Sequence, residues 1–144
     1  ALEIYRAALA NDALRDTLKL YFSLWLNELA LRQGQSVDAD SLTFINDYVG
    51  ARHGEDGWAR RLALHAQGKL SYDELLAAAD NDGERAEAHF YEGLRRWRSG
   101  DERNGKELMR KVLSTKMMSF FEYDMARSYL EWNELPQRGR PAGR

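Results

Sequence analysis

Residues 86–113 read AEAHFYEGLRRWRSGDERNGKELMRKVL, and this stretch decides the fold. Phe90, Leu94 and Trp97 recur three and four residues apart, which predicts a helix with one apolar stripe. Ser99-Gly100-Asp101 interrupts this pattern, and a second helical run continues to Leu113. A glycine just beyond a helix end favours the left-handed backbone conformation that closes the last turn. The stretch therefore predicts two helices joined by a glycine turn.

The same punctuation occurs twice more towards the N-terminus. Gln33-Gly34-Gln35 and Gln67-Gly68-Lys69 each end one helical run and precede another. Gly34 and Gly68 are 34 residues apart, and Gly68 and Gly100 are 32 apart. A spacing near 34 residues is the length of one two-helix repeat, so we expect repeated helix pairs.

The rest of the chain is also compatible with helix. Both prolines, Pro136 and Pro141, lie in the last nine residues, and strong helix formers are abundant before them. A second apolar stripe runs from Leu18 to Leu29, whereas alternation with a period of two residues is absent. We expect an all-α fold of about eight helices, near residues 1–10, 13–33, 38–51, 55–67, 71–80, 84–98, 102–116 and 119–132.

Length and composition restrict the class of protein. The chain has 144 residues, 44% hydrophobic content, 4 Trp, 7 Tyr and 5 Phe, which predicts a folded domain. A net charge of -2 argues against a dedicated nucleic-acid protein. The absence of cysteine excludes disulfides and thiolate nucleophiles. We expect no transmembrane segment and see no signal-peptide pattern, and the sequence does not choose between cytoplasm and periplasm.

Residues 86–113 resemble a tetratricopeptide repeat. Gly93 and Gly105 match the two small residues at which the helices of such a repeat approach closely. Gly100-Asp101 matches the turn and Val112-Leu113 the closing pair. The departures are His89 and Met109, where an aromatic residue is usual, and Glu92, where Leu is usual. The resemblance implies a right-handed superhelix of two-helix repeats.

This resemblance implies a helical-repeat domain over residues 1–135. Ala1, Tyr5 and Ala8 match the second helix of a repeat, so residues 1–10 would be a truncated repeat. Upstream repeats or a second copy would then cover its Ala and Ile surface. Repeats are expected over 13–51, 55–80 and 84–116, a capping helix over 119–132, and a flexible basic tail over 136–144. The run from Phe90 to Arg127 is also similar to the ends of repeat-containing bacterial envelope lipoproteins.

Tetratricopeptide repeats are scaffolds that bind a peptide or helix of a partner protein in a concave groove. Phe90 and Leu94 occupy places where carboxylate-clamping repeats carry polar residues, which disfavours a C-terminal carboxylate ligand. Each aromatic candidate has an alternative role in the core, and this role is favoured for Trp25 and Trp58. The groove positions that the resemblance implies are Tyr21, Glu28, Arg32, Trp58, His65, Glu87, Phe90, Leu94, Trp97 and Arg98.

The sequence contains no recognisable catalytic or metal-binding motif. His53, His65 and His89 lack the spacing of metal ligands. Asp80-Asn81-Asp82-Gly83 resembles part of a calcium loop but lacks both end ligands, so we expect Asp82 to cap a helix. We therefore expect neither an enzyme nor a cofactor.

Two alternatives to the adaptor remain. The repeat stack could be a structural arm of a larger enzyme, secretion or envelope assembly without its own ligand. The basic residues between Arg95 and Lys111, together with the Arg-rich tail, could bind nucleic acid, although the negative net charge disfavours this. For the basic residues we favour a solvated face with pairs three and four residues apart.

Overall fold

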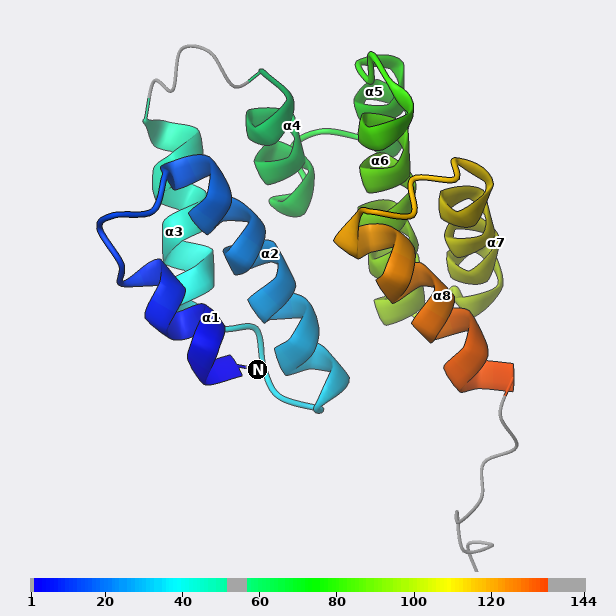
Figure 1. The fold of residues 1–144 in the computed structure, drawn as a ribbon, viewed down its shortest axis with the longest axis horizontal. Coiled ribbons are helices and arrows are strands. Elements are labelled where there is room, and N and C mark those ends of the chain that lie inside the picture. Colours follow the sequence, from blue (N-terminus) through cyan, green and yellow to red (C-terminus); the bar gives the residue numbers. More distant parts are fainter. Residues whose placement is uncertain (1, 52–56, 135–144) are drawn as a thin grey trace, which may run out of the picture. The chain divides into compact units, whose positions relative to one another are not determined.

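The computed structural model describes residues 2–51 and 57–134, which form eight helices and no strand (Figure 1). The helices are α1 (Leu2–Leu9), α2 (Asp16–Arg32), α3 (Ala39–Gly50), α4 (Gly57–Ala66), α5 (Tyr72–Ala77), α6 (Asp82–Arg98), α7 (Glu102–Ser114) and α8 (Phe121–Glu134). The all-α prediction is confirmed, and each helix lies close to its expected range. The expected tail over residues 136–144 and His53 lie outside the described residues.

The chain divides into two compact units, Ala1–Ala78 and Ala79–Arg144, which we call unit 1 and unit 2. In unit 1, α2 packs against α1, α3 and α4, and α4 also packs against α3 and α5. In unit 2, each of α6, α7 and α8 packs against the other two. The helices of each expected repeat are therefore neighbours. The superhelix, which depends on how both units are arranged, stays a prediction.

The three glycine turns are confirmed. Gly34, Gly68 and Gly100 have φ angles of 70°, 73° and 90°, in the left-handed region that favours glycine. After each glycine, the next backbone N–H reaches back into the helix: Gln35 N donates to Ala30 O, Lys69 N to Leu64 O and Asp101 N to Arg96 O, each at 2.9 Å. This closure satisfies carbonyls that a helix end otherwise leaves unpaired.

The start of α6 corrects one expectation. Asn81, and not Asp82, is the capping residue: Asn81 Oδ1 accepts a hydrogen bond from Glu84 N at 2.9 Å. Asn81 has the extended backbone typical of a capping residue, with φ −147° and ψ 172°. The helix consequently begins at Asp82, two residues earlier than expected. Asp82 instead forms an ion pair with Arg85.

Two glycines allow α6 and α7 of unit 2 to approach closely. A Cβ atom on Gly105 would lie 3.1 Å from Gly93 O and 3.2 Å from the backbone N of Trp97. A Cβ on Gly93 would lie 3.0 Å from Met109 Cε and 3.2 Å from Leu108 Cβ. At Gly105 two of the three nearest atoms belong to the backbone of α6, so a side chain there would push the two helices apart, whereas at Gly93 the nearest atom is the flexible end of Met109.

Candidate functional site

The ten expected groove residues divide evenly between the two units. Five lie on α2 and α4 in unit 1, and five lie on α6 in unit 2. The side chain of Arg32 lies outside the described part of the chain. The remaining residues on α2 and α4 are Tyr21, Glu28, Trp58 and His65; those on α6 are Glu87, Phe90, Leu94, Trp97 and Arg98.

Burial corrects the groove expectation at half of these positions. Phe90 and Leu94 are 0% and 2% exposed, and Glu28, His65 and Glu87 are also buried. A buried side chain offers no surface to a partner. The apolar stripe of a helix is buried first by neighbouring helices, and this is the core alternative that the sequence left open.

Trp97 is half-buried between the other two helices of unit 2. Its backbone and Cβ lie against Gly105 of α7, and its ring centroid lies 5.4 Å from that of Tyr129 on α8. Lys106 Nζ lies 5.7 Å from the ring centroid. Trp97 therefore contacts both α7 and α8 within unit 2. Among the groove residues of α6, only Arg98 is exposed.

The basic stretch of α6 and α7 is largely paired. Glu92 has a fully buried side chain, and its oxygens accept hydrogen bonds from Arg95 Nε at 2.9 Å and Arg96 Nε at 2.8 Å. Lys106 pairs with Glu102 at 2.6 Å, four residues away. The prediction that these basic residues form ion pairs with carboxylates three and four residues away is confirmed for Arg95, Arg96 and Lys106. Because these basic side chains are paired with carboxylates, they do not form the concentrated positive charge that binding to nucleic acid would need.

A hollow in unit 1 is the better candidate site. Two cavities of about 610 and 300 Å³ share Arg6 and Asp40 as lining residues, and we call the pair together the α1–α3 hollow. The other residues that line the larger part are Ala30, Gln35, Ser36, Val37, Asp38 and Ala39. The other residues that line the smaller part are Leu9, Ala10, Thr43, Phe44 and Asp47.

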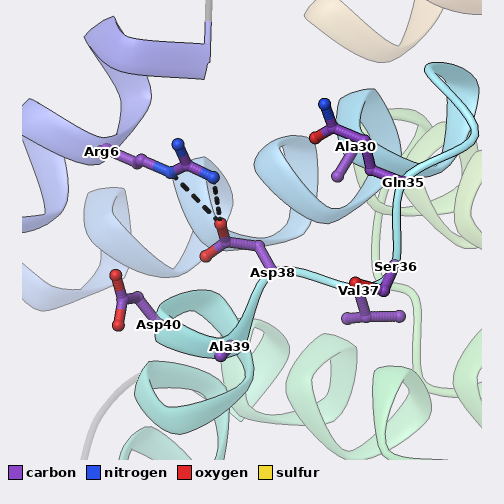
Figure 2. Close-up of a pocket in the computed structure, with 8 residues that line it drawn as sticks. All are labelled: Arg6, Ala30, Gln35, Ser36, Val37, Asp38, Ala39 and Asp40. Carbon is purple, nitrogen blue, oxygen red and sulfur yellow. Dashed lines mark hydrogen bonds and ion pairs between the residues drawn. The ribbon is translucent and has the colours of Figure 1, made fainter.

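An ion pair within unit 1 shapes this hollow. Figure 2 shows Arg6 reaching from α1 to Asp38 at the start of α3, with Nη2 and Nε lying 2.9 and 3.3 Å from Asp38 Oδ2. The other carboxylate oxygen, Oδ1, caps α3 by accepting hydrogen bonds from the backbone N and Oγ of Ser41 at 3.0 and 3.1 Å. Burial raises the pKa of Asp38, but these hydrogen bonds outweigh burial and hold the pKa below its ordinary value.

Two further carboxylates of the hollow have no such partners. Asp40 and Asp47 are exposed, and neither forms an ion pair with another described residue. Asp40 lies in the first turn of α3, where a negative charge suits the helix dipole. Asp47 lies in the last turn, where a negative charge is unfavourable, and α3 itself has no basic residue in that turn; Arg60 of α4 donates to Val49 O there at 3.4 Å. Since Arg6 is neutralised by Asp38, the described lining residues carry an excess of two negative charges, those of Asp40 and Asp47.

Sequence reasoning missed this site, because Arg6 and Asp38 are 32 residues apart and nothing local connects them. The local signals were an aspartate at the first position of the expected helix 38–51 and a carboxylate near the end of that helix. Among the described residues no three side chains of His, Asp or Glu are placed to hold a metal ion. No helix within the described ranges combines the length and the apolar character that a membrane span requires. No family model, curated protein or solved structure matches this chain.

Proposed function

We propose that this chain is a protein-interaction scaffold that binds a helix or peptide of a partner protein in the α1–α3 hollow. The observation that carries the proposal is the hollow itself, whose lining includes the half-buried Leu9 and Phe44 and two exposed carboxylates, Asp40 and Asp47, without an ion-pair partner among the described residues. A few polar groups around an apolar depression are typical of recognition sites. Half of the groove residues implied by the tetratricopeptide resemblance are buried, so the proposal rests on the α1–α3 hollow instead.

The tetratricopeptide family itself remains part of this proposal. Its support is the close approach of α6 and α7 at Gly93 and Gly105, together with three glycine turns at spacings of 34 and 32 residues. Helix-pair repeats of this kind act as platforms for other proteins and carry no chemistry of their own. The close approach of α6 and α7 and the regular glycine turns therefore support a non-catalytic role.

The proposal is tested by filling the hollow. Thr43 lines the smaller cavity, is exposed, and donates only to Ala39 O in its own helix, at 3.0 Å. Thr43→Trp should therefore block the hollow without disturbing the core. Ser114→Trp is the matched control, because exposed Ser114 makes the same type of bond, to Arg110 O at 3.0 Å, in unit 2.

The measurement is capture from native lysate by cross-linking, with wild type and both variants shown to be equally helical by circular dichroism. A protein retained by wild type and Ser114→Trp but lost by Thr43→Trp supports the scaffold and identifies its client. If Thr43→Trp retains every protein that Ser114→Trp retains, the hollow is not the binding surface.

One observation favours the structural-arm alternative. Ile4 on α1 is 71% exposed, the highest exposed fraction among the large hydrophobic side chains of the described residues. Tyr5, the next residue, packs its ring 5.5 Å from that of Phe22 on α2, whereas the side chain of Ile4 stays open to solvent. In this second proposal another segment or a second copy covers Ile4. Ile4→Glu would then abolish binding of that segment or second copy, whereas Thr43→Trp would leave this binding intact. Loss of binding with Thr43→Trp but not with Ile4→Glu would favour the scaffold.

A further inference from the structure

We infer that the segment bound in the α1–α3 hollow is a partner helix with two cationic side chains seven residues apart. This inference rests on the proposed function and identifies the chemistry of the partner. It is argued from charge complementarity: Asp40 and Asp47 both line the hollow, both are exposed, and neither has an ion-pair partner among the described residues.

The spacing of the carboxylates sets the spacing of their partners. Seven residues are nearly two turns of helix, so Asp40 and Asp47 lie on one side of α3, about 10 Å apart along its axis. A helix lying alongside α3 would face both carboxylates with residues at the same seven-residue interval. The two helices α1 and α3 supply Leu9 and Phe44 to the smaller cavity, and a depression between helices suits the apolar face of a third.

Asp47 provides the strongest part of the argument. A carboxylate in the last turn of a helix opposes the dipole, and α3 itself has no basic residue there. Arg60 of α4 donates to Val49 O in that turn at 3.4 Å but forms no ion pair with Asp47. A side chain that is locally unfavourable and has no internal partner is expected where function needs it. A cation from a partner would stabilise Asp47, whereas an acidic partner would be repelled by both carboxylates.

The other charges at the hollow leave this conclusion unchanged. Among the lining residues that the structure describes, Arg6 is the only cation, and its guanidinium is bound to Asp38 at 2.9 Å. Asp38 is buried and fully used by Arg6 and Ser41. Only Asp40 and Asp47 therefore remain to attract a ligand, and both attract cations.

The test uses the full chain and three labelled peptides of 18 residues. Each peptide is an amphipathic helix with a row of Leu flanked by two test positions seven residues apart. These positions are Arg in the first peptide, Gln in the second and Glu in the third. Fluorescence anisotropy at low and moderate salt measures the affinity of each peptide for wild type, Asp40→Asn, Asp47→Asn and Thr43→Trp.

Asp73→Asn is the matched control, since Asp73 is exposed and is the second residue of α5, as Asp40 is of α3. We expect the Arg peptide to bind most tightly and Asp47→Asn or Asp40→Asn to weaken it about threefold to fivefold at low salt. Moderate salt should reduce this difference. The Gln peptide should bind wild type, Asp73→Asn and both hollow variants equally.

Equal binding of the Arg, Gln and Glu peptides, or of the Arg peptide to wild type and Asp47→Asn, overturns the inference. If Thr43→Trp still blocks the Gln peptide in that case, the hollow remains a binding site and the proposed function survives. Failure of all three peptides to bind wild type also overturns the inference, while the capture experiment continues to test the function. Self-association lost in Asp47→Asn would identify a second copy as the occupant and exclude the basic helix.

Discussion

Asp38 holds the start of α3 with one oxygen and Arg6 of α1 with the other. Its side chain is only 6% exposed, whereas that of Arg6 is 51% exposed. The ion pair is therefore partly solvated at its cationic end, which limits its contribution to stability. The capping bonds to Ser41 are the more dependable contribution, because an uncapped helix start leaves backbone N–H groups unpaired.

The first prediction concerns the charge of Asp38. Asp38→Asn keeps an oxygen for the cap but removes the charged partner of Arg6, so we expect a loss of about 1 kcal/mol in the free energy of unfolding at pH 7. The pKa of Asp38 is lower in the folded chain than its ordinary 3.8. The stabilisation is therefore complete well above pH 3.8 and is lost as the pH falls through the lower, folded-state pKa.

Urea unfolding of wild type and Asp38→Asn at pH 7 and at pH 3 measures this difference. The gap between the two proteins should narrow at pH 3, while Asp73→Asn should follow wild type at both values. A gap of equal size at both pH values would show that the charge of Asp38 contributes nothing and that the variant acts through altered geometry.

At the scale of the element, three helix ends share one device. Gly34, Gly68 and Gly100 all have positive φ, and an added Cβ at any of them would meet nothing within 4 Å. The requirement for glycine is therefore conformational and not steric with respect to the rest of the chain. Each glycine ends a helix (α2, α4 and α6), and the turn that it forms sets where the following helix can begin.

The second prediction separates conformation from packing at Gly68. Gly68→Ala should destabilise the chain by about 1 kcal/mol, because alanine is strained at φ 73°. Gly68→Asn should cost less, since asparagine enters the left-handed region more easily. Thermal unfolding followed by circular dichroism ranks the two variants. Equal losses for Ala and Asn would mean that the left-handed conformation is not what glycine supplies at this turn.

At the scale of the whole molecule, the chain forms two compact units whose boundary follows Ala78. Each unit has its own buried side chains: Leu20, Ile45 and Leu62 in unit 1, and Phe90 and Met109 in unit 2. Separate cores allow separate local unfolding, in which one unit opens while the other keeps its hydrogen bonds.

The third prediction tests this independence with Gly105→Ala. The added Cβ would press on the backbone at Gly93 and Trp97, which cannot yield without separating α6 from α7, so we expect a loss of about 1–3 kcal/mol in unit 2. Hydrogen exchange measured by mass spectrometry should become faster in α6, α7 and α8 and stay unchanged in α1–α5.

Gly50→Ala is the control for this experiment. Gly50 is the last residue of α3, its φ lies outside the left-handed region, and a Cβ there would meet nothing within 4 Å. Exchange should stay at the wild-type rate, or slow slightly in α3, because alanine favours helix over glycine. Faster exchange in α2 and α3 of Gly105→Ala would instead show that the two units unfold as one.

The sequence by itself determined the class of fold and the places where helices end. These properties depend on local signals: apolar residues three and four apart, and a glycine that alone tolerates positive φ at Gly34, Gly68 and Gly100. The residues of one turn or one helix carry the whole signal, so no distant contact is needed to read it. The Asp82 cap failed by one residue because neighbouring Asn81 competes for the same role.

Only the tertiary structure decided which side chains are available for function. The stripe of Phe90, Leu94 and Trp97 is the same whether it faces a partner or another helix, and packing in the folded chain buries the first two completely or nearly so. Conversely, Arg6 meets Asp38 across 32 residues, and the hollow beside them exists only once α1 and α3 lie together. Surface and cavity are properties of spatial neighbours, which local periodicity does not specify.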